Sequence, residues 1–274
     1  MKIHSLVFSP TGTSAKIARA IADGILQMKN DAGSFSDATR QPLRDSFGQE
    51  DLVVMAAPVY GGKMAPLAKE RFRDVKGRHT PCVLVAVYGN RAFENALRDM
   101  ADFARNRGFV PVAAAAFVGE HSYSSARMPV AAGRPDDSDL KAAGELGMAI
   151  ARKVQTGNLS PVEPGSLRDE VSSEKSLRNF RNFVEEYQQQ RKNAPVQYLP
   201  ELNPALCNGC GTCAQACPTA AIGAKGQGLE AEKCIRCCAC VKVCPSGARS
   251  FFTPFASVLA ENFNVRKSPV WQIG

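Results

Sequence analysis

The sequence predicts an α/β fold: a doubly wound parallel sheet of five strands followed by a small α+β domain. Apolar runs rich in β-branched residues alternate with segments of helical spacing over the first half of the chain, which predicts the sheet. Eight of the ten cysteines form two runs of one spacing in the last third, which marks the smaller domain. A chain of 274 residues is long enough for both domains.

Four apolar runs predict strands, and a fifth, weaker strand is expected near Gly33–Ser36. The four runs are Ile3–Phe8, Leu52–Ala57, Cys82–Val87 and Phe109–Val118. Helical spacing predicts helices over Ser14–Met28, Pro66–Val75, Asn90–Arg107 and Ser138–Val154. In a doubly wound sheet, ligands bind beyond the carboxyl ends of the strands, so we expect a site in the loops that follow them.

The loop after the first predicted strand has the composition of an anion site. It is Ser9-Pro10-Thr11-Gly12-Thr13-Ser14, and it opens a predicted helix. Free backbone amides and the positive end of the helix dipole meet at such a position, which favours a phosphate. The loop lacks the G-x-x-x-x-G-K-[ST] pattern of a P-loop. An ordinary helix N-cap made by serine or threonine is the alternative.

Two further loops each combine glycine with an aromatic side chain. The first follows Leu52–Ala57 and contains Pro58, Tyr60, Gly61, Gly62 and Lys63. The second follows Cys82–Val87 and contains Gly89, Asn90, Arg91 and Phe93. Packing of the two aromatics and a simple glycine turn are the alternatives to a ligand site.

The cysteine runs both have the spacing C-x2-C-x2-C-x3-C-P. This is the bacterial spacing for two 4Fe-4S clusters, in which the fourth cysteine of each run ligates the other cluster. A disulfide framework suits short secreted chains, and a zinc site shows paired C-x2-C knuckles, so both alternatives are disfavoured. The sequence therefore predicts one cluster on Cys207, Cys210, Cys213 and Cys244 and the other on Cys234, Cys237, Cys240 and Cys217.

Two cysteines, Cys82 and Cys238, fall outside this pattern. Cys82 begins an apolar run, and a buried cysteine commonly acts as a small hydrophobic residue. Cys238 lies between two predicted ligands whose register is complete without it. We expect both to be spectators.

The hydroxyl-rich loop and the two loops with an aromatic side chain resemble those of flavodoxins. Together with the cysteine runs, they make the chain resemble the flavodoxin–ferredoxin fusion family over residues 2–156 and 196–252. The resemblance implies a flavodoxin-like sheet that binds FMN and a ferredoxin-like domain with two clusters. It implies that Ser9, Thr11, Gly12, Thr13 and Ser14 hold the FMN phosphate, that Tyr60 and Phe93 flank the flavin ring, and that Gly89 and Asn90 contact its edge. Gly61 fits a peptide that flips on flavin reduction, and Pro58, Gly62 and Arg91 complete the two ring loops.

The sequence departs from flavodoxins at informative places. Thr13-Ser14 stands where Asn-Thr is usual, and Tyr60 stands where tryptophan is commoner. Lys63 and Arg91 are basic in loops that flavodoxins keep acidic. Because cations stabilise an anionic reduced flavin, we expect a higher reduction potential than in a typical flavodoxin.

A third loop, after Phe109–Val118, contains His121 and Tyr123. Both side chains are candidates for proton delivery in a two-electron reduction. The alternative is a loop whose polar groups satisfy the local backbone. The sequence therefore assigns no catalytic residue, and enzymatic activity stays open.

The sequence divides into four parts. Residues 1–156 are the predicted FMN-binding domain, residues 157–195 a linker with a helix near Leu177–Arg191, residues 196–252 the two-cluster domain, and residues 253–274 a C-terminal tail. Short strands are expected near Thr219–Ile222, Gly228–Glu232 and Ala248–Phe252. An apolar stripe on the linker helix predicts a packing surface between domains.

The net charge of +8 comes from basic and acidic residues interspersed along the chain. This pattern disfavours nucleic-acid binding, although a basic face would steer acidic redox partner proteins. No apolar stretch is long enough to predict a membrane span. The cysteine thiols and the missing export signal favour a cytoplasmic location.

Two functions remain open from the sequence. The first is an iron-sulfur flavoprotein that relays single electrons between two clusters and FMN, as an electron carrier or a reductase of a small-molecule acceptor. The second is a flavin-free binding or redox-sensing module with a flavodoxin-like docking domain.

Overall fold

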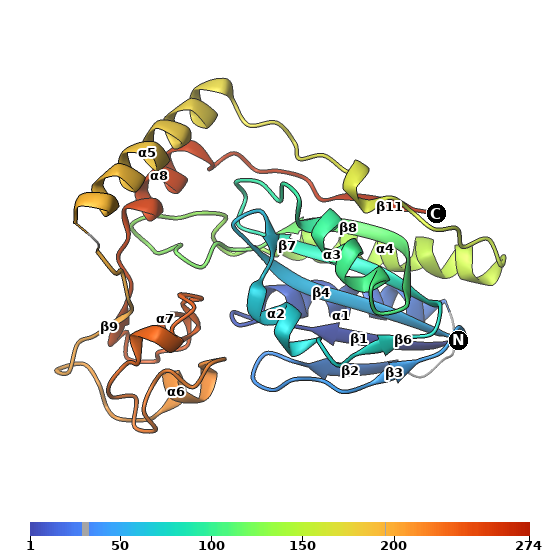
Figure 1. Cartoon of the computed structure of the whole chain (residues 1–274), viewed down its shortest axis with the longest axis horizontal. Helices are drawn as coiled ribbons and strands as arrows, with labels where there is room; N and C mark the ends of the chain where they lie inside the picture. Colours follow the sequence, from blue (N-terminus) through green and yellow to red (C-terminus); the bar gives the residue numbers. More distant parts are fainter. Residues whose placement is uncertain (29–32, 195) are drawn as a thin grey trace. The chain divides into compact units, whose positions relative to one another are not determined.

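The computed structural model of the chain describes residues 1–28, 33–194 and 196–274 (Figure 1). These residues form two compact units. The first, the sheet unit, comprises Met1–Glu120, Gly133–Glu170 and Lys267–Gly274. The second, the cysteine unit, comprises His121–Ala132 and Val171–Arg266. The chain therefore leaves the sheet unit twice and returns to it twice.

Five parallel strands form the centre of the sheet unit, as the sequence predicts. They are β1 (Lys2–Val7), β2 (Gly33–Asp37), β4 (Asp51–Tyr60), β7 (Thr80–Tyr88) and β8 (Phe109–Val118). Their order is β2-β1-β4-β7-β8, and β1 pairs with β4 from Lys2 and Asp51 to Val7 and Ala56. This is the flavodoxin-like strand order, in which the order of the parallel strands reverses between β1 and β4. The weak strand expected near Gly33–Ser36 is confirmed as β2.

Two antiparallel strands extend the parallel sheet. β5 (Lys63–Met64) pairs with the end of β4, and β11 (Val270–Ile273) pairs with β8. The ring of Trp271 in β11 stacks on Phe117 in β8 with centroids 6.4 Å apart. The last residues of the expected tail are therefore an edge strand of the sheet. A separate parallel pair joins β3 (Ser46–Phe47) to β6 (Lys76–Gly77).

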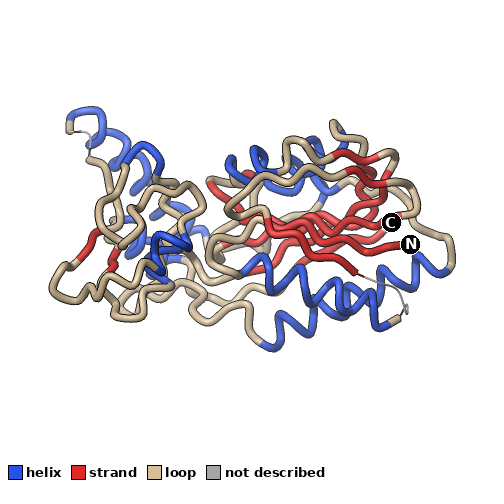
Figure 2. The backbone as a smooth tube through the Cα atoms, turned by 90° about the horizontal axis from the view of Figure 1, so that it is seen from below, coloured by secondary structure: helices blue, strands red, loops and turns tan. Residues whose placement is uncertain are grey.

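Helices cover both sides of the sheet, as Figure 2 shows. The helices of the sheet unit are α1 (Thr13–Gln27), α2 (Pro66–Arg71), α3 (Ala96–Arg105) and α4 (Asp137–Gln155), with one 3-10 turn at Pro164–Ser166. α3 begins later than the sequence predicts. Asn90 and Glu94 have positive φ angles of 67° and 47°, which a right-handed helix excludes, so residues 90–95 form a loop.

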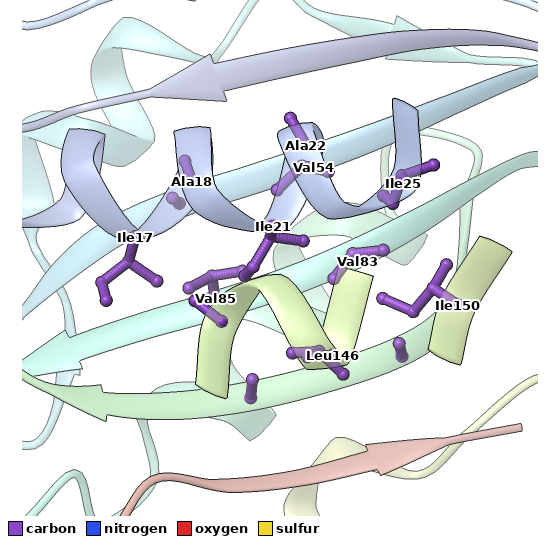
Figure 3. Close-up of a cluster of buried hydrophobic side chains, with 14 of the residues drawn as sticks. Ile17, Ala18, Ile21, Ala22, Ile25, Val54, Val83, Val85, Leu146 and Ile150 are labelled. Atoms are coloured by element: carbon purple, nitrogen blue, oxygen red, sulfur yellow. The ribbon is translucent and has the colours of Figure 1, made fainter. Parts of the chain in front are cut away.

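The core between α1, α4 and the sheet follows the helical and strand periods of the sequence (Figure 3). Ile17, Ile21 and Ile25 recur every four residues on α1 and are fully buried. They pack with Leu146 and Ile150 of α4 against buried valines of β4 and β7, which alternate along each strand. Burial of this apolar face stabilises the sheet on which the loops are carried.

A buried ion pair marks the start of α4. Arg134 donates to Asp139 through Nε at 2.8 Å and through Nη2, and both side chains are almost inaccessible to water. Asp136 caps the helix by accepting from the backbone amides of Ser138 and Asp139. Removal of one partner leaves the other charge buried and uncompensated.

The cysteine unit has little regular structure. Its elements are α5 (Glu174–Asn193), β9 (Glu201–Leu202), α6 (Thr212–Ala216), a 3-10 turn at Ala231–Lys233, α7 (Ala239–Lys242), β10 (Arg249–Ser250) and α8 (Pro254–Asn262). β9 and β10 form an antiparallel pair. Strands near Thr219–Ile222 and Gly228–Glu232 were expected, and this expectation is wrong. Those segments form no strand, although Glu230 N of the second donates to Ala221 O of the first at 2.8 Å.

The aromatic stripe of α5 packs inside the cysteine unit. The rings of Phe183 and Tyr187 each lie 4.9 Å from that of Phe255 on α8, edge to face. Phe180 lies 5.5 Å from Phe263 at the end of α8. The linker helix α5 thus packs against α8, which is the first part of the expected tail. None of the helices within the described residues is long and apolar enough to span a membrane.

We predict that Asp139→Asn lowers the free energy of unfolding of the sheet unit by about 3–5 kcal/mol, because it leaves Arg134 charged and buried. The measurement is urea-induced unfolding followed by the fluorescence of Trp271, which is the one tryptophan of the chain. Asp137→Asn, which neutralises an exposed carboxylate in the same helical turn, is the control. An equal loss in both variants would show that the buried ion pair is not the cause.

Candidate functional site

The two cysteine runs lie on loops that lead into short helices. Cys207 and Cys210 precede α6, and Cys213 lies within it. Cys234 and Cys237 precede α7, and Cys240 lies within it. All ten cysteines of the chain are free thiols.

The fourth cysteine of each run lies with the other run. Cys217 lines one small pocket together with Cys234, Cys237 and Cys240. Cys217 is also close enough to Cys234, Cys237 and Cys240 to contribute to the raised pKa of each thiol. Cys244 is likewise close enough to Cys210 of the first run to act on its thiol. The crosswise ligation of two clusters stays a prediction, and the proximity of Cys217 to the second run is consistent with it.

The surroundings of the sulfur atoms fit a cluster. Thr212 Oγ1 lies 3.3 Å from Cys210 Sγ, and Ala221 N donates to Cys217 Sγ at 3.3 Å. Such hydrogen bonds stabilise thiolates and adjust cluster potentials. Gly226 has a φ of +76°, and a Cβ there would lie 2.9 Å from Cys213 Sγ, so the turn leaves this sulfur its space.

The described residues contain no group of three or more His, Cys, Asp or Glu side chains placed to hold one metal ion. A mononuclear zinc site needs its thiolates about 2.3 Å from a single centre. A cubane binds each of its four thiolates at a different iron, so its ligands stand further apart.

The two ligand sets differ in burial. Burial raises the pKa of Cys237 to about 11 and that of Cys240 to about 12, with Arg249 opposing the effect at Cys240. Cys210 is exposed, and hydrogen bonding by Thr212 lowers its pKa. The set that contains Cys237 and Cys240 therefore depends more strongly on a bound cation to keep its thiolates charged.

The two remaining cysteines behave as buried hydrophobic residues. Cys238 is 2% exposed, and its Sγ donates to Arg236 O at 3.6 Å. Cys82 is fully buried within β7. Burial raises the pKa of both thiols well above the ordinary value, so neither has the character of a nucleophile.

The hydroxyl-rich loop lies at the carboxyl end of β1 and opens α1. Gly12 is the N-cap with a φ of +83°, and as a glycine it offers no side chain to cap α1. Ser9 Oγ accepts from Ala15 N at 3.0 Å, and Ser9 N donates to Thr39 Oγ1 at 2.8 Å. Ser14 Oγ is buried and has no hydrogen-bond partner among the residues that the structure describes. A buried unpaired hydroxyl beside the free amides of a helix N-terminus fits an absent anionic ligand.

The loop after β4 is a tight hairpin. Tyr60 pairs with Lys63 across Gly61 and Gly62, whose φ angles are 58° and 76°. Two positive φ angles define a type I′ turn, which glycine adopts without strain. No atom lies within 4 Å of a Cβ built on Gly61, so its peptide has room to turn over. Tyr60 is half-buried, and Lys63 is exposed.

The loop after β7 is strained and charged. Arg91 N donates to Gly89 O at 2.9 Å, which closes a three-residue turn around the buried Asn90. Arg91 Nη2 forms a salt bridge of 2.6 Å with Glu94 Oε1. This carboxylate partly offsets the positive charge of Arg91, which weakens the expected effect of that residue on a flavin potential. The expected rise in the flavin reduction potential then depends mainly on Lys63.

The position of Phe93 favours the packing alternative. Its side chain is 1% exposed and packs edge to face on Tyr88, with centroids 5.5 Å apart. A ring buried in the core offers little surface to a flavin. Of the two aromatics expected beside the ring, only Tyr60 is accessible.

The candidate proton donors belong to the cysteine unit. His121 Nδ1 accepts from Tyr123 N at 3.0 Å, and the Tyr123 ring packs on Phe251 at 5.1 Å. Lys242 Nζ donates to Ser124 O at 2.7 Å. Burial raises the pKa of Tyr123 to about 12. These contacts fit a packed loop, so no catalytic role is assigned.

Sequence reasoning missed three residues that organise the flavin loops. Asp99 accepts from Met64 N at 3.0 Å and binds Lys69, which holds the hairpin after Tyr60. Asp169 and Lys267 hold the loop after β7 from segments that the sequence identifies as linker and tail. A linker aspartate or a tail lysine carries no motif, so only the three-dimensional structure reveals these contacts.

Comparisons with known proteins agree with the cysteine pattern. Residues 199–248 match the 4Fe-4S dicluster domain. Over 75 residues the chain is 39% identical to a tetrathionate reductase subunit of Archaeoglobus fulgidus, covering 26% of this chain and 33% of that protein. Over 28 residues it is 61% identical to ferredoxin-type protein NapF of Escherichia coli K12, covering 10% of this chain and 17% of that protein. The chain spans a third or less of these curated relatives.

Solved structures similar to the chain include a flavodoxin from the domain Archaea, with 17% identity and a TM-score of 0.37, over 57% of this chain and 99% of that one. The two-electron-reduced flavodoxin of Megasphaera elsdenii has 13% identity and a TM-score of 0.36, over 54% and 98%. These similarities are too distant to carry an argument. The strand order of the sheet unit itself defines the flavodoxin-like fold. The chain therefore joins a flavodoxin-like unit to a two-cluster 4Fe-4S segment.

We predict that two double variants separate crosswise from within-run ligation. Cys217→Ala with Cys237→Ala removes two ligands of one crosswise cluster, so one intact cluster with wild-type EPR features remains. Cys217→Ala with Cys210→Ala removes one ligand from each cluster, so no intact four-thiolate cluster remains. Iron and sulfide analysis after anaerobic reconstitution accompanies the spectra.

Cys238→Ala is the matched control, and it retains both clusters with about eight irons per chain. If each run ligates its own cluster, the outcomes of the two double variants are exchanged, which would contradict the crosswise arrangement.

Proposed function

We propose that this protein is an iron-sulfur flavoprotein that relays electrons between two 4Fe-4S clusters and FMN. The cluster half of the proposal rests on the eight cysteines and the matching dicluster domain. The observation that carries the flavin half is the buried, unpaired hydroxyl of Ser14 at the N-terminus of α1. It lies beyond the carboxyl end of β1, where flavodoxin-like sheets bind their ligands.

Each loop has a distinct part in this proposal. The backbone amides and hydroxyls between Ser9 and Ser14 bind the FMN phosphate. Tyr60 covers one face of the ring, and Gly61 supplies a peptide that adapts to the flavin redox state. Gly89 and Asn90 contact the ring edge through their backbone. FMN exchanges one or two electrons and each cluster exchanges one, so the pairing interconverts the two kinds of transfer.

The physiological partners of such a relay are other redox proteins, and a small-molecule acceptor is an additional possibility. The positive net charge favours partners with acidic surfaces. The free thiols of the chain favour a reducing location such as the cytoplasm.

A second candidate function is a flavin-free binding or redox-sensing module. The core position of Phe93 favours it, because the loop then offers no aromatic to the second face of a ring. Protein purified without oxygen distinguishes the two candidates. The relay predicts flavin absorption bands and about one FMN per chain in the acid extract, whereas the module predicts cluster absorption alone.

We predict that Ser14→Ala weakens FMN binding by about tenfold, since a hydrogen bond to a charged group contributes about 1.5–3 kcal/mol. Riboflavin lacks the phosphate, so its binding to the same variant stays unchanged. Quenching of flavin fluorescence on titration with protein measures both dissociation constants.

Ser34→Ala, at an exposed position on β2, is the control and leaves both affinities unchanged. If Ser14→Ala weakens the binding of FMN and of riboflavin equally, this loop does not bind the FMN phosphate. Failure of the wild-type protein to bind FMN at all would refute the relay itself.

A further inference from the structure

The loop at residues 89–94 has an unfavourable backbone that is held in part by residues outside the loop. Asn90 and Glu94 both have positive φ angles, and the turn around Asn90 is the rare γ form. Strained backbone persists only where the surrounding structure holds it, and it is concentrated at functional sites. The contacts that hold this loop therefore bear on its function.

Asp169 provides two of these contacts. Its Oδ1 accepts from Phe93 N at 2.8 Å, and its Oδ2 accepts from Glu94 N at 3.0 Å. Both oxygens of one carboxylate are thus engaged by consecutive amides of the loop. Hydrogen bonds to a charged acceptor are about twice as strong as neutral ones.

Lys267 provides the third contact. Its ammonium donates to Arg91 O at 2.7 Å, and its side chain is 5% exposed. Burial lowers the pKa of Lys267, whereas the nearby Asp169 and Glu170 oppose this and favour its charge. The ammonium is thus held by a backbone carbonyl, and the two nearby carboxylates offset part of the cost of its burial.

Both residues lie at the junctions between the two units. Asp169 and Glu170 are the last residues of the sheet unit before the cysteine unit, and Lys267 and Ser268 are the first after it. Ser268 N donates to Glu170 Oε2 at 3.0 Å, so the outgoing and returning segments are bound to each other. The loop expected at the flavin edge is therefore hydrogen-bonded to the two segments of the sheet unit that flank residues 171–266 in the chain.

We propose that Asp169 and Lys267 are positioning residues that fix the 89–94 loop in the shape required for flavin binding. The inference rests on the proposed function. It assigns a role in flavin affinity and redox potential to two residues outside the loops that contact the ring. It also makes the flavin loop dependent on the segments that carry the chain into and out of the cluster-bearing unit.

The experiment compares Asp169→Ala, Asp169→Asn and Lys267→Met in the full-length holoprotein. Glu163→Gln is the matched control, because Glu163 is a carboxylate in the same segment that binds Arg105, away from the loop. The readouts are the FMN dissociation constant, the visible circular dichroism of bound FMN and the flavin reduction potential. Trp271 fluorescence during urea unfolding shows whether the sheet unit is folded.

We expect Asp169→Ala to weaken FMN binding by about tenfold or more, because two charge-assisted hydrogen bonds are lost. Lys267→Met keeps the length of the side chain and weakens binding to a smaller extent. Asp169→Asn retains one acceptor oxygen and restores part of the affinity. The circular dichroism of bound flavin and its potential change in both Asp169→Ala and Lys267→Met, but not in Glu163→Gln.

Wild-type affinity, circular dichroism and potential in a folded Asp169→Ala or Lys267→Met variant would overturn the inference and leave the relay intact. Equal changes in Glu163→Gln would also overturn it, since they would indicate a general effect of the segment. If Asp169→Ala is unfolded, Asp169→Asn and Lys267→Met decide the question. Absence of FMN binding by the wild type refutes the proposed function instead.

Discussion

The cysteine unit depends on one constraint, which is that four thiolates must reach each iron cluster from different directions. Three come from a single short loop, and the fourth must come from elsewhere in the chain. The structure meets this requirement by placing Cys217 beside Cys234, Cys237 and Cys240, and Cys244 near Cys210. In the crosswise assignment that we propose, each half of the unit supplies one ligand to the cluster of the other half. Among its described residues the unit has one pair of two-residue strands and the packed helices α5 and α8.

The sheet unit solves a different problem, which is to hold irregular loops on a rigid support. Its apolar core fixes the strand ends, and the loops begin where the strands stop. Carboxylates outside the loops then bind the loop amides, as Asp99 does at Met64 and Asp169 does at Phe93 and Glu94. Positive φ angles at Asn90 and Glu94 persist because these contacts offset their cost. The apolar core therefore fixes the positions of the strand ends, whereas individual carboxylates fix the conformation of each loop.

The sequence predicted those features that depend on local periodicity or fixed spacing. Apolar runs predicted four of the five parallel strands, a weaker expectation placed the fifth near Gly33–Ser36, and the cysteine spacing predicted the dicluster segment that the domain match supports. Features set by distant contacts were missed. β11 pairs with β8 far along the chain, the stripe on α5 packs on α8, and Phe93 enters the core. In each case an apolar side chain could be buried against several different partners. The tertiary packing of the folded chain decides which partner it contacts.

The most direct test of the account is an anaerobic reductive titration of the purified protein, followed by visible absorption and EPR. Two clusters that take one electron each and an FMN that takes two predict an uptake of about four electrons per chain, with bleaching of the flavin bands. An uptake of about two electrons with no flavin signal would contradict the relay between clusters and flavin.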